Sequence, residues 1–251
     1  MRKSALSGLK VVEHGGFMAA QCGKLLADMG AEVIKVEAPQ GDELRDYGPF
    51  PNDLPHKEKS GLFMFLNMNK LGVTLNLETK TGKEILHRLL KESDVLVHDR
   101  QPARAKKLGL AYVEASKINP RLVVTAITPY GSAGPYKDYK GYDLNILAAG
   151  GGMNSGYPDR EPLKHPCSQG YIQGGIHGAA ATMAALLARN LTGKGQQVDI
   201  SAASVWPFFM GIADVPAYFQ GKTARRSGFR RANMVYPFEL SPVKDLSLIH
   251  I

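Results

Sequence analysis

Short apolar segments rich in valine, leucine and isoleucine alternate along this chain with longer segments whose apolar residues recur at helical spacing. The predicted strands are residues 9–13, 32–37, 73–77, 95–97, 122–127 and 196–201. Strand–helix alternation of this kind is typical of a mostly parallel sheet with helices on both faces. We therefore expect an α/β fold.

The predicted helices lie between these strands. Residues 21–29 form a helical segment that ends at Gly30, and residues 81–91 form an amphipathic one. In a Rossmann-like sheet, ligands bind beyond the carboxyl ends of the strands. The segments that directly follow strands are therefore candidates for a binding site: residues 14–20, 38–46, 98–107 and 128–143. Residues 38–60 are polar and proline-rich, which predicts a surface loop.

The second half of the chain has a different composition. Residues 171–187 contain no Lys, Arg, Asp or Glu and are rich in glycine and alanine. Because glycine weakens a helix interior by ~1 kcal/mol relative to alanine, its abundance here indicates close backbone packing, in the core or against another chain. His177 lies inside this segment and is predicted to be packed. The strand at 196–201 and a helix around Trp206 follow.

Charge and cysteine content limit the classes of function. The net charge is +8, but no zinc-finger or RNA-binding motif accompanies it, so we expect a phosphorylated ligand and no nucleic acid. No apolar run approaches the ~20 residues that span a bilayer, and no secretory leader is visible, so no membrane association is expected. Two thiols, Cys22 and Cys167, indicate a cytoplasmic protein without a disulfide scaffold. The spacing of histidines and cysteines predicts no metal site.

The first predicted strand ends at a glycine turn. Gly15, Gly16 and Gly23, followed by Glu37, share features with a dinucleotide-binding fingerprint, but the spacing G-x-G-x-x-G is absent. A tight strand-to-helix turn is the simpler interpretation. His14, at the end of this strand, could serve as an acid or base, although a lone histidine is more often structural.

Several segments together resemble the class III CoA-transferases, which include carnitine CoA-transferase, formyl-CoA transferase and α-methylacyl-CoA racemase. The resemblance covers about residues 6 to 245. The matching segments, in chain order, are 6–13 (LSGLKVVE), 25–39 (LLADMGAEVIKVEAP), 41–45 (GDELR), 67–70 (NMNK), 94–97 (DVLV), 141–144 (GYDL) and 192–201 (TGKGQQVDIS). No single motif is decisive, but their order is typical of this family.

The resemblance implies that the protein acts on CoA thioesters and that two elongated chains interlock as a dimer. Basic side chains suit the phosphates of CoA, so Arg104 is a candidate for phosphate binding in addition to the residues that the resemblance implies. The implied CoA-binding residues are Phe17, Met18, Ala19, Ala38, Leu75, Asn76, Asp99, Arg100, Lys107, Tyr139, Lys140 and Tyr142. Two positions depart from the family. Ala38 replaces an arginine of some members, and residues 17–20 (FMAA) replace a frequent Ala-Gly-Pro.

The largest departure concerns the nucleophile. Members of this family transfer CoA through an aspartate, which forms a mixed anhydride and then an aspartyl-CoA thioester. Counting back without gaps from Thr192 places Tyr171 at that position, and tyrosine cannot form the anhydride. Family racemases have an aspartate there and a histidine just before the position of Asp143. This chain has Tyr142 and Tyr171, so two-base racemisation is not supported either.

Three interpretations stay open. Asp143, which alone predicts a helix N-cap and matches an acidic residue near the family's active site, could act as nucleophile or base. Gln169, Tyr171 or His177 could support another reaction on a bound CoA thioester. Alternatively, the chain is a non-catalytic CoA-binding subunit, in a homodimer or in a heteromer with an active homologue. The expected function is CoA transfer between an acyl-CoA and a small carboxylic acid.

The resemblance also predicts how the chain is divided. Residues 1–220 would form the large CoA-binding domain, which would be incomplete, and residues 221–245 would enter a small domain. Residues 246–251 are predicted to be a non-native tail, because LSLIHI resembles translated adaptor sequence and family members are longer. A truncated gene model would explain both features.

Overall fold

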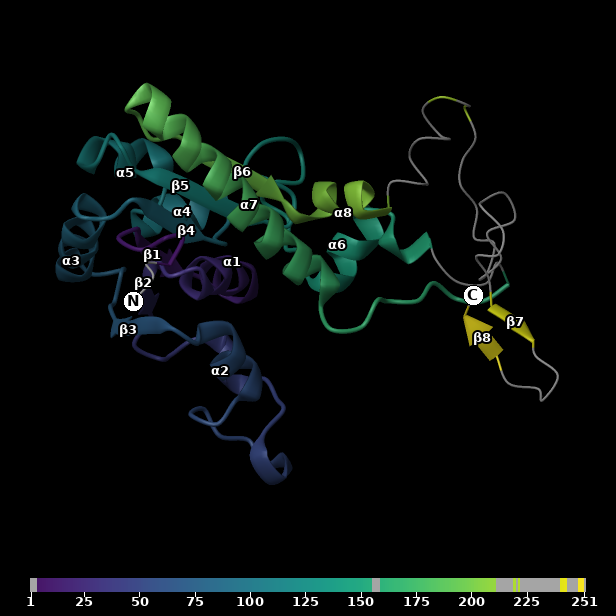
Figure 1. The fold of residues 1–251 in the computed structure, drawn as a ribbon. Helices are drawn as coiled ribbons and strands as arrows, with labels where there is room; N and C mark the ends of the chain where they lie inside the picture. Colours follow the sequence, from purple (N-terminus) through teal and green to yellow (C-terminus); the bar gives the residue numbers. More distant parts are fainter. Residues whose placement is uncertain are drawn as a thin grey trace.

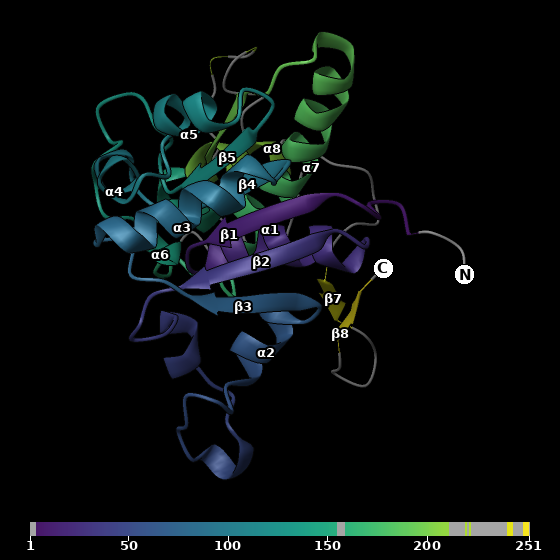
Figure 2. The same cartoon turned by 90° about the vertical axis from the view of Figure 1, so that its left-hand side faces the viewer.

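The computed structural model describes residues 4–154, 159–210, 219, 221, 240–242 and 248–250. Its centre is a six-stranded, fully parallel sheet in the order β3-β2-β1-β4-β5-β6 (Figures 1 and 2). The strands are β1 (Lys10–His14), β2 (Glu32–Glu37), β3 (Lys70–Thr74), β4 (Val95–His98), β5 (Val123–Thr128) and β6 (Gln197–Ser201). The predicted α/β fold with a parallel sheet is confirmed.

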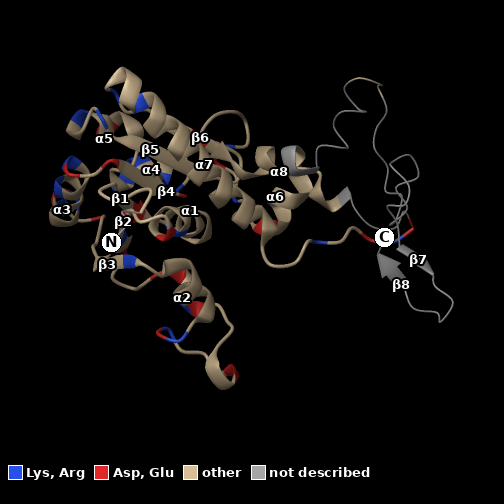
Figure 3. Ribbon diagram, viewed as in Figure 1, with Lys and Arg blue, Asp and Glu red and all other residues tan. Residues whose placement is uncertain are grey.

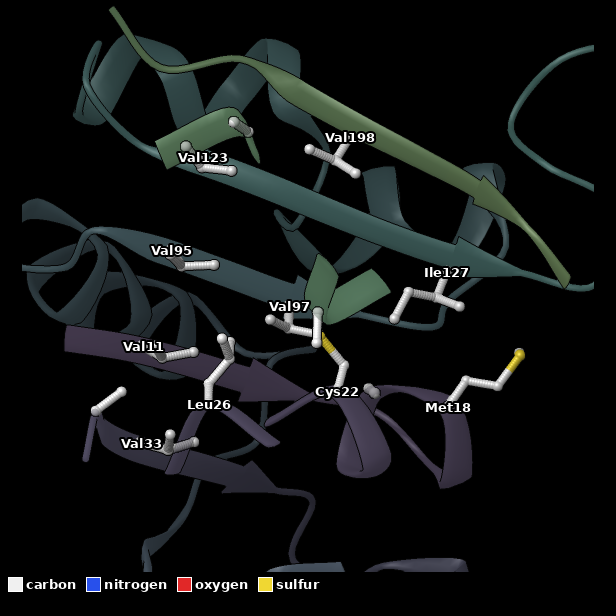
Figure 4. Packing of buried hydrophobic residues seen from close by; sticks show 14 of the residues in the cluster. Val11, Met18, Cys22, Leu26, Val33, Val95, Val97, Val123, Ile127 and Val198 are labelled. Carbon is white, nitrogen blue, oxygen red and sulfur yellow. The ribbon is translucent and has the colours of Figure 1, made fainter. Parts of the chain in front are cut away.

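One face of the sheet is covered by α1 (Phe17–Asp28) and α7 (Gln169–Thr192). Val11, Val33 and Val95 point from their strands into this layer, where they meet Cys22 and Leu26 of α1 (Figure 4). Successive side chains of a strand point to opposite faces, so the next residues along β1 and β4 belong to the other layer.

The opposite face is covered by α3 (Lys80–Lys91), α4 (Pro102–Leu108) and α5 (Tyr112–Ile118). Val12, Leu96 and Val124 point into this layer and are almost fully buried. Both faces of the sheet are therefore apolar at its centre, which explains why β4 and β5 are buried throughout and read as nearly continuous apolar runs.

Helix α7 packs directly on α1 and on β5 through its glycines. A Cβ atom on Gly175 would lie 2.6 Å from Gln21 Cβ, and one on Gly178 would lie 2.5 Å from Ile127 Cδ1. Arg189 is the one charged side chain of the helix, which is otherwise drawn without charge in Figure 3. The predicted close backbone packing is confirmed, and it is packing against the chain's own core.

Some predicted bounds were wrong. The strand predicted at 73–77 lies at 70–74, and α1 begins at Phe17 rather than at residue 21. The loop at 38–60 contains two short 3-10 helices, η1 (Glu43–Asp46) and η2 (Pro51–Asp53). The remaining helices are α2 (Gly61–Asn67), α6 (Asp143–Ala149), α8 (Ala202–Met210) and the 3-10 helix η3 (Gly152–Asn154). Strands β7 (Leu240–Pro242) and β8 (Leu248–His250) form a separate antiparallel pair.

The predicted division at residues 220 and 245 lies mostly outside the described residues. The pair β7–β8 joins the segments predicted to be the entry to a small domain and the non-native tail. The division into domains stays a prediction.

Candidate active site

The turn after β1 is built around a carboxylate. Gly16 is the N-cap of α1 and has no side chain to bond the first turn of the helix. Both oxygens of Asp99, which follows β4, accept from the Gly16 N–H at 3.0 and 2.9 Å, and one accepts from Ala19 N–H at 3.4 Å. A side chain on Gly15 would collide with the Asp99 carboxylate. The glycines therefore admit an internal carboxylate at the helix N-terminus, the place where a dinucleotide fold binds pyrophosphate.

A polar cavity of about 500 Å³ opens at the carboxyl ends of β1, β2 and β3. Ala38, Leu75 and Asn76, three of the predicted CoA-binding residues, line it together with His14. Basic side chains reach it from Lys57, Arg100 and Arg104. The cavity thus combines space with cations at the edge of the sheet where ligands of parallel α/β folds bind.

A second cavity of about 370 Å³ adjoins the first and is more aromatic. The two share Glu43, Arg100 and Arg104. Predicted site residues gather in its wall, which includes Phe17, Met18, Asp99, Arg100, Lys140, Tyr142 and Tyr171. These residues come from segments far apart in the sequence, and they meet because the strands before them end at the same edge of the sheet.

Five predicted site residues line neither cavity. Ala19 is buried under the turn, and Lys107 is exposed, with its ammonium 3.9 Å from a Glu78 carboxylate oxygen. The backbone carbonyl of Tyr139 accepts from Gln101 Nε2 at 2.7 Å. Gln169 is half-buried at the start of α7. The fifth is Asp143.

Asp143 caps a helix, but not its own. It is the first residue of α6, whose N-cap is Tyr142. Its Oδ1 accepts from the N–H groups of Gly170 at 2.8 Å and Tyr171 at 3.3 Å, at the start of α7. The Lys164 ammonium lies 2.8 Å from Oδ2, and the residue is 6% exposed. The prediction that Asp143 is the N-cap residue of a helix was wrong, because Tyr142 is the N-cap of α6; Asp143 instead accepts from the first turn of α7. Both of its oxygens face protein groups.

Tyr171 faces the aromatic cavity. Its ring lies 5.6 Å from the ring of Phe17, centroid to centroid, and the residue is half-buried. Burial raises the pKa of its phenol to about 12, so the group is neutral near pH 7. It can donate a hydrogen bond to a carbonyl oxygen, but it offers no carboxylate.

A buried ion network fixes the polar side of the site. The Lys35 ammonium lies 3.1 Å from Glu13 and 2.6 Å from Asp42, and the Lys70 ammonium lies 2.7 Å from the other oxygen of Glu13. Burial opposes the charge of Lys35, but Glu13 and Asp42 outweigh it and raise its pKa. The network ties β1, β2 and the start of β3 to Asp42 in the loop at 38–46. The sequence signal was two charged residues, Glu13 and Lys35, inside apolar strands.

Two histidines lie side by side at the ends of β1 and β4. His14 and His98 are partners in the sheet, and both are buried. Burial lowers the pKa of both groups, that of His98 to about 3. Nδ1 of His98 accepts from the Arg100 N–H at 3.3 Å. Both rings are therefore neutral near pH 7.

One carboxylate of the site was missed. Glu43 begins η1 and lines both cavities. Burial and the neighbouring Asp99 raise the pKa of its carboxyl group. Its position in a polar loop gave no signal that it lies next to Asp99.

Within residues 4–154 and 159–210 and the short described segments, no three His, Cys, Asp or Glu side chains gather in an arrangement that could hold a metal ion. No described helix has the length and apolarity needed to span a bilayer.

Comparisons with known proteins agree with this architecture. Residues 6–251 match the family model described as CoA-transferase family III. The succinate–glutarate CoA-transferase of Agrobacterium fabrum is 33% identical over 99% of this chain and 63% of its own length. Succinyl-CoA:(R)-benzylsuccinate CoA-transferase subunit BbsE of Thauera aromatica is 36% identical over 78% of this chain and 48% of its own length.

A solved structure shows the same fold. The CAIB/BAIF family protein of Brucella suis superposes with a TM-score of 0.87 at 33% identity, over 97% of this chain and 65% of its own. The chain thus spans about half to two thirds of the length of the relatives it matches. A family match along nearly the whole sequence, a parallel sheet of the same topology and cavities at its carboxyl edge lead to one conclusion: the chain belongs to CoA-transferase family III.

Proposed function

We propose that the protein binds a CoA thioester across the two adjoining cavities and transfers CoA from it to a small carboxylic acid. The observation that carries the proposal is the junction itself. Arg100 and Arg104 lie between a polar cavity and an aromatic one, at the ligand-binding edge of a parallel sheet. Guanidinium groups suit phosphate oxygens better than any other side chain because they donate two parallel hydrogen bonds.

In this proposal each cavity takes a different part of the ligand. The anionic nucleotide part of CoA lies near Arg100 and Arg104, with Ala38, Leu75 and Asn76 around it. The thioester lies in the aromatic cavity, between Phe17 and Tyr171, and Lys140 lies at its rim. The Tyr171 phenol then donates to the thioester carbonyl. This role fits a neutral hydroxyl, whereas the role of nucleophile does not.

A non-catalytic role is the second candidate. Tyr171 stands where the resemblance implies an aspartate, and Asp143 is held by α7 and Lys164. A chain that binds CoA without exchanging it would complete the site of a partner, either a second copy or an active homologue. The Thauera relative is described as a subunit, which supports a heteromer. In either case we propose a cytoplasmic protein, since Cys22 and Cys167 are both free thiols.

The two candidates differ in one measurement. The purified protein is incubated with succinyl-CoA and ¹³C-labelled acetate, glutarate or oxalate, and labelled acyl-CoA is measured by mass spectrometry. Label in the acyl-CoA supports transfer. Tight CoA binding by calorimetry without label transfer, restored when an active homologue is added, supports the subunit role. Absence of CoA binding contradicts both.

A further inference from the structure

We infer that Glu43 is the carboxylate that accepts the acyl group and then CoA in this protein. The inference rests on the proposed CoA transfer and names the residue that carries it. Exchange of CoA between two acids needs a side-chain carboxylate that reaches the thioester, because only a carboxylate forms an anhydride and is regenerated. The question is which carboxylate of the site is free to do so.

Most carboxylates around the two cavities are already engaged. Glu37 accepts from two nitrogens of Arg45 at 2.8 and 2.9 Å. Asp42 lies 2.6 Å from the buried ammonium of Lys35. These groups hold the wall of the polar cavity, and using one of them as a nucleophile would leave a buried cation without its counter-charge.

The carboxylates of Glu78 and Asp99 are engaged as well. Glu78 lies 2.7 Å from a guanidinium nitrogen of Arg104, and Asp99 is bonded by both oxygens to the start of α1. Asp46 lines the polar cavity only and does not reach the aromatic one. Glu43 is the carboxylate that lines both, and within the described residues it makes no hydrogen bond or ion pair.

The position of Glu43 suits attack on a thioester. Its Oε1 lies so close to the glycine turn that a Cβ on Gly16 would be 2.5 Å away. The carboxylate therefore stands over the start of α1, in the neighbourhood of Arg100, at the point where the cavities meet. Partial burial and Asp99 raise the pKa of this carboxyl group, which makes its ionised form a stronger nucleophile than a fully solvated carboxylate.

The reaction is balanced without any other reactant. A Glu43 oxygen attacks the thioester carbonyl carbon, the C–S bond breaks, and CoA leaves as the thiolate. The thiolate attacks the Glu43 carbonyl carbon of the mixed anhydride, which releases the first acid as its carboxylate and forms a glutamyl-CoA thioester. The second carboxylate repeats these two steps in reverse, giving the new acyl-CoA and free Glu43.

Trapping locates the carboxylate. The protein is treated with succinyl-CoA and hydroxylamine, which converts an activated carboxyl group to a hydroxamate, and is digested with trypsin. Fragment spectra of the peptide covering residues 36–45 distinguish Glu43 from Glu37 and Asp42. We expect the hydroxamate on Glu43. We also expect Glu43→Gln to lower the exchange rate by about 1,000-fold or more. Glu32→Gln, the same change at the opposite edge of the sheet, should leave it unaltered.

The outcomes separate this inference from the proposed function. A hydroxamate on another residue, or exchange in Glu43→Gln within twofold of the wild type, overturns the role of Glu43 and leaves CoA transfer standing. No exchange by the wild-type protein, although it binds CoA, overturns both. Circular dichroism and CoA affinity of Glu43→Gln check that the variant is folded.

Discussion

The starts of α1 and α7 solve the same problem with the same chemical group, but in different surroundings. Neither Gly16 nor Ser168 caps its helix with its own side chain, and an aspartate from another element does so in each case. Asp99, at α1, lines the aromatic cavity, whereas Asp143, at α7, lines neither cavity and has Lys164 beside its second oxygen. Asp99 is thus part of the wall of the site, whereas Asp143 is not. An aspartate near an active site is therefore no sign of a nucleophile until its hydrogen bonds are counted.

The largest expected effect is that of Asp99→Ala. It removes a buried acceptor from the N–H groups of Gly16 and Ala19 and leaves the glycine turn without support. We expect a loss of about 3 kcal/mol in the free energy of unfolding, measured in urea. CoA affinity should fall as well, because the turn borders the cavity. A loss in stability with unchanged affinity would contradict the placement of the site.

Asp143→Ala should be less costly, at about 2 kcal/mol, because it removes a single capping oxygen from α7. Asp143→Asn keeps a carbonyl acceptor and should recover about half of that loss. CoA affinity and exchange should stay within about twofold of the wild type in the Asn variant. If Asp143→Asn is as stable as the wild type but exchanges no CoA, Asp143 is the nucleophile and this comparison fails.

A smaller effect is a pH dependence of the unfolding free energy, which arises from His98 next to Asp99. His98 directly precedes Asp99, and burial lowers its pKa from 6.5 to about 3. Between these values the unfolded chain binds a proton that the folded protein does not. Stability should therefore fall as the pH falls, by about 1 kcal/mol between pH 6 and pH 5 from this group. His98→Gln should remove that part of the slope of unfolding free energy against pH. An unchanged slope would mean that His98 is already charged in the fold.

The smallest expected effect is that of Lys164→Ala. The lysine lies 2.8 Å from Asp143, but its side chain is 41% exposed, and ion pairs in contact with solvent contribute little. We expect a loss of about 0.5 kcal/mol or less. A loss above ~1.5 kcal/mol would show that Lys164, rather than the cap on α7, holds Asp143 in place.

The central strands β4 and β5 were predictable because their apolar runs are buried on both faces, and β2 was predicted with its observed bounds. The third strand was predicted three residues too late because the alternation of polar and apolar residues continues beyond the end of β3. Leu75 and Leu77 are buried after the strand ends, against the helices of the second layer. The register is instead set by pairing of residues 70–74 with β2 and by the ion pair of Lys70 with Glu13. The seven-residue helices α2, α4 and α5 went unpredicted because about two turns carry too little periodicity.

Two signals predicted parts of the site: the family resemblance, which also supplied Leu75, Asn76 and Tyr171, and the rule that ligands bind in segments that follow strands. That rule located Phe17, Ala38, Arg100 and Lys140, all of which line a cavity. The rule could not predict which groups each side chain would hydrogen-bond. Asp99 reaches a turn 83 residues away in sequence.

The central claim is that CoA binds at the carboxyl edge of the sheet, around Arg100. Calorimetric titration of CoA into the wild type, Arg100→Gln and Arg121→Gln tests it most directly. Arg121 lies just before β5, at the amino edge of the sheet, and serves as the matched control. We expect Arg100→Gln to weaken CoA binding by about tenfold or more, through the loss of a charge-assisted contact, and Arg121→Gln to leave it unchanged. Equal affinities in all three proteins, or a loss confined to Arg121→Gln, would contradict this account.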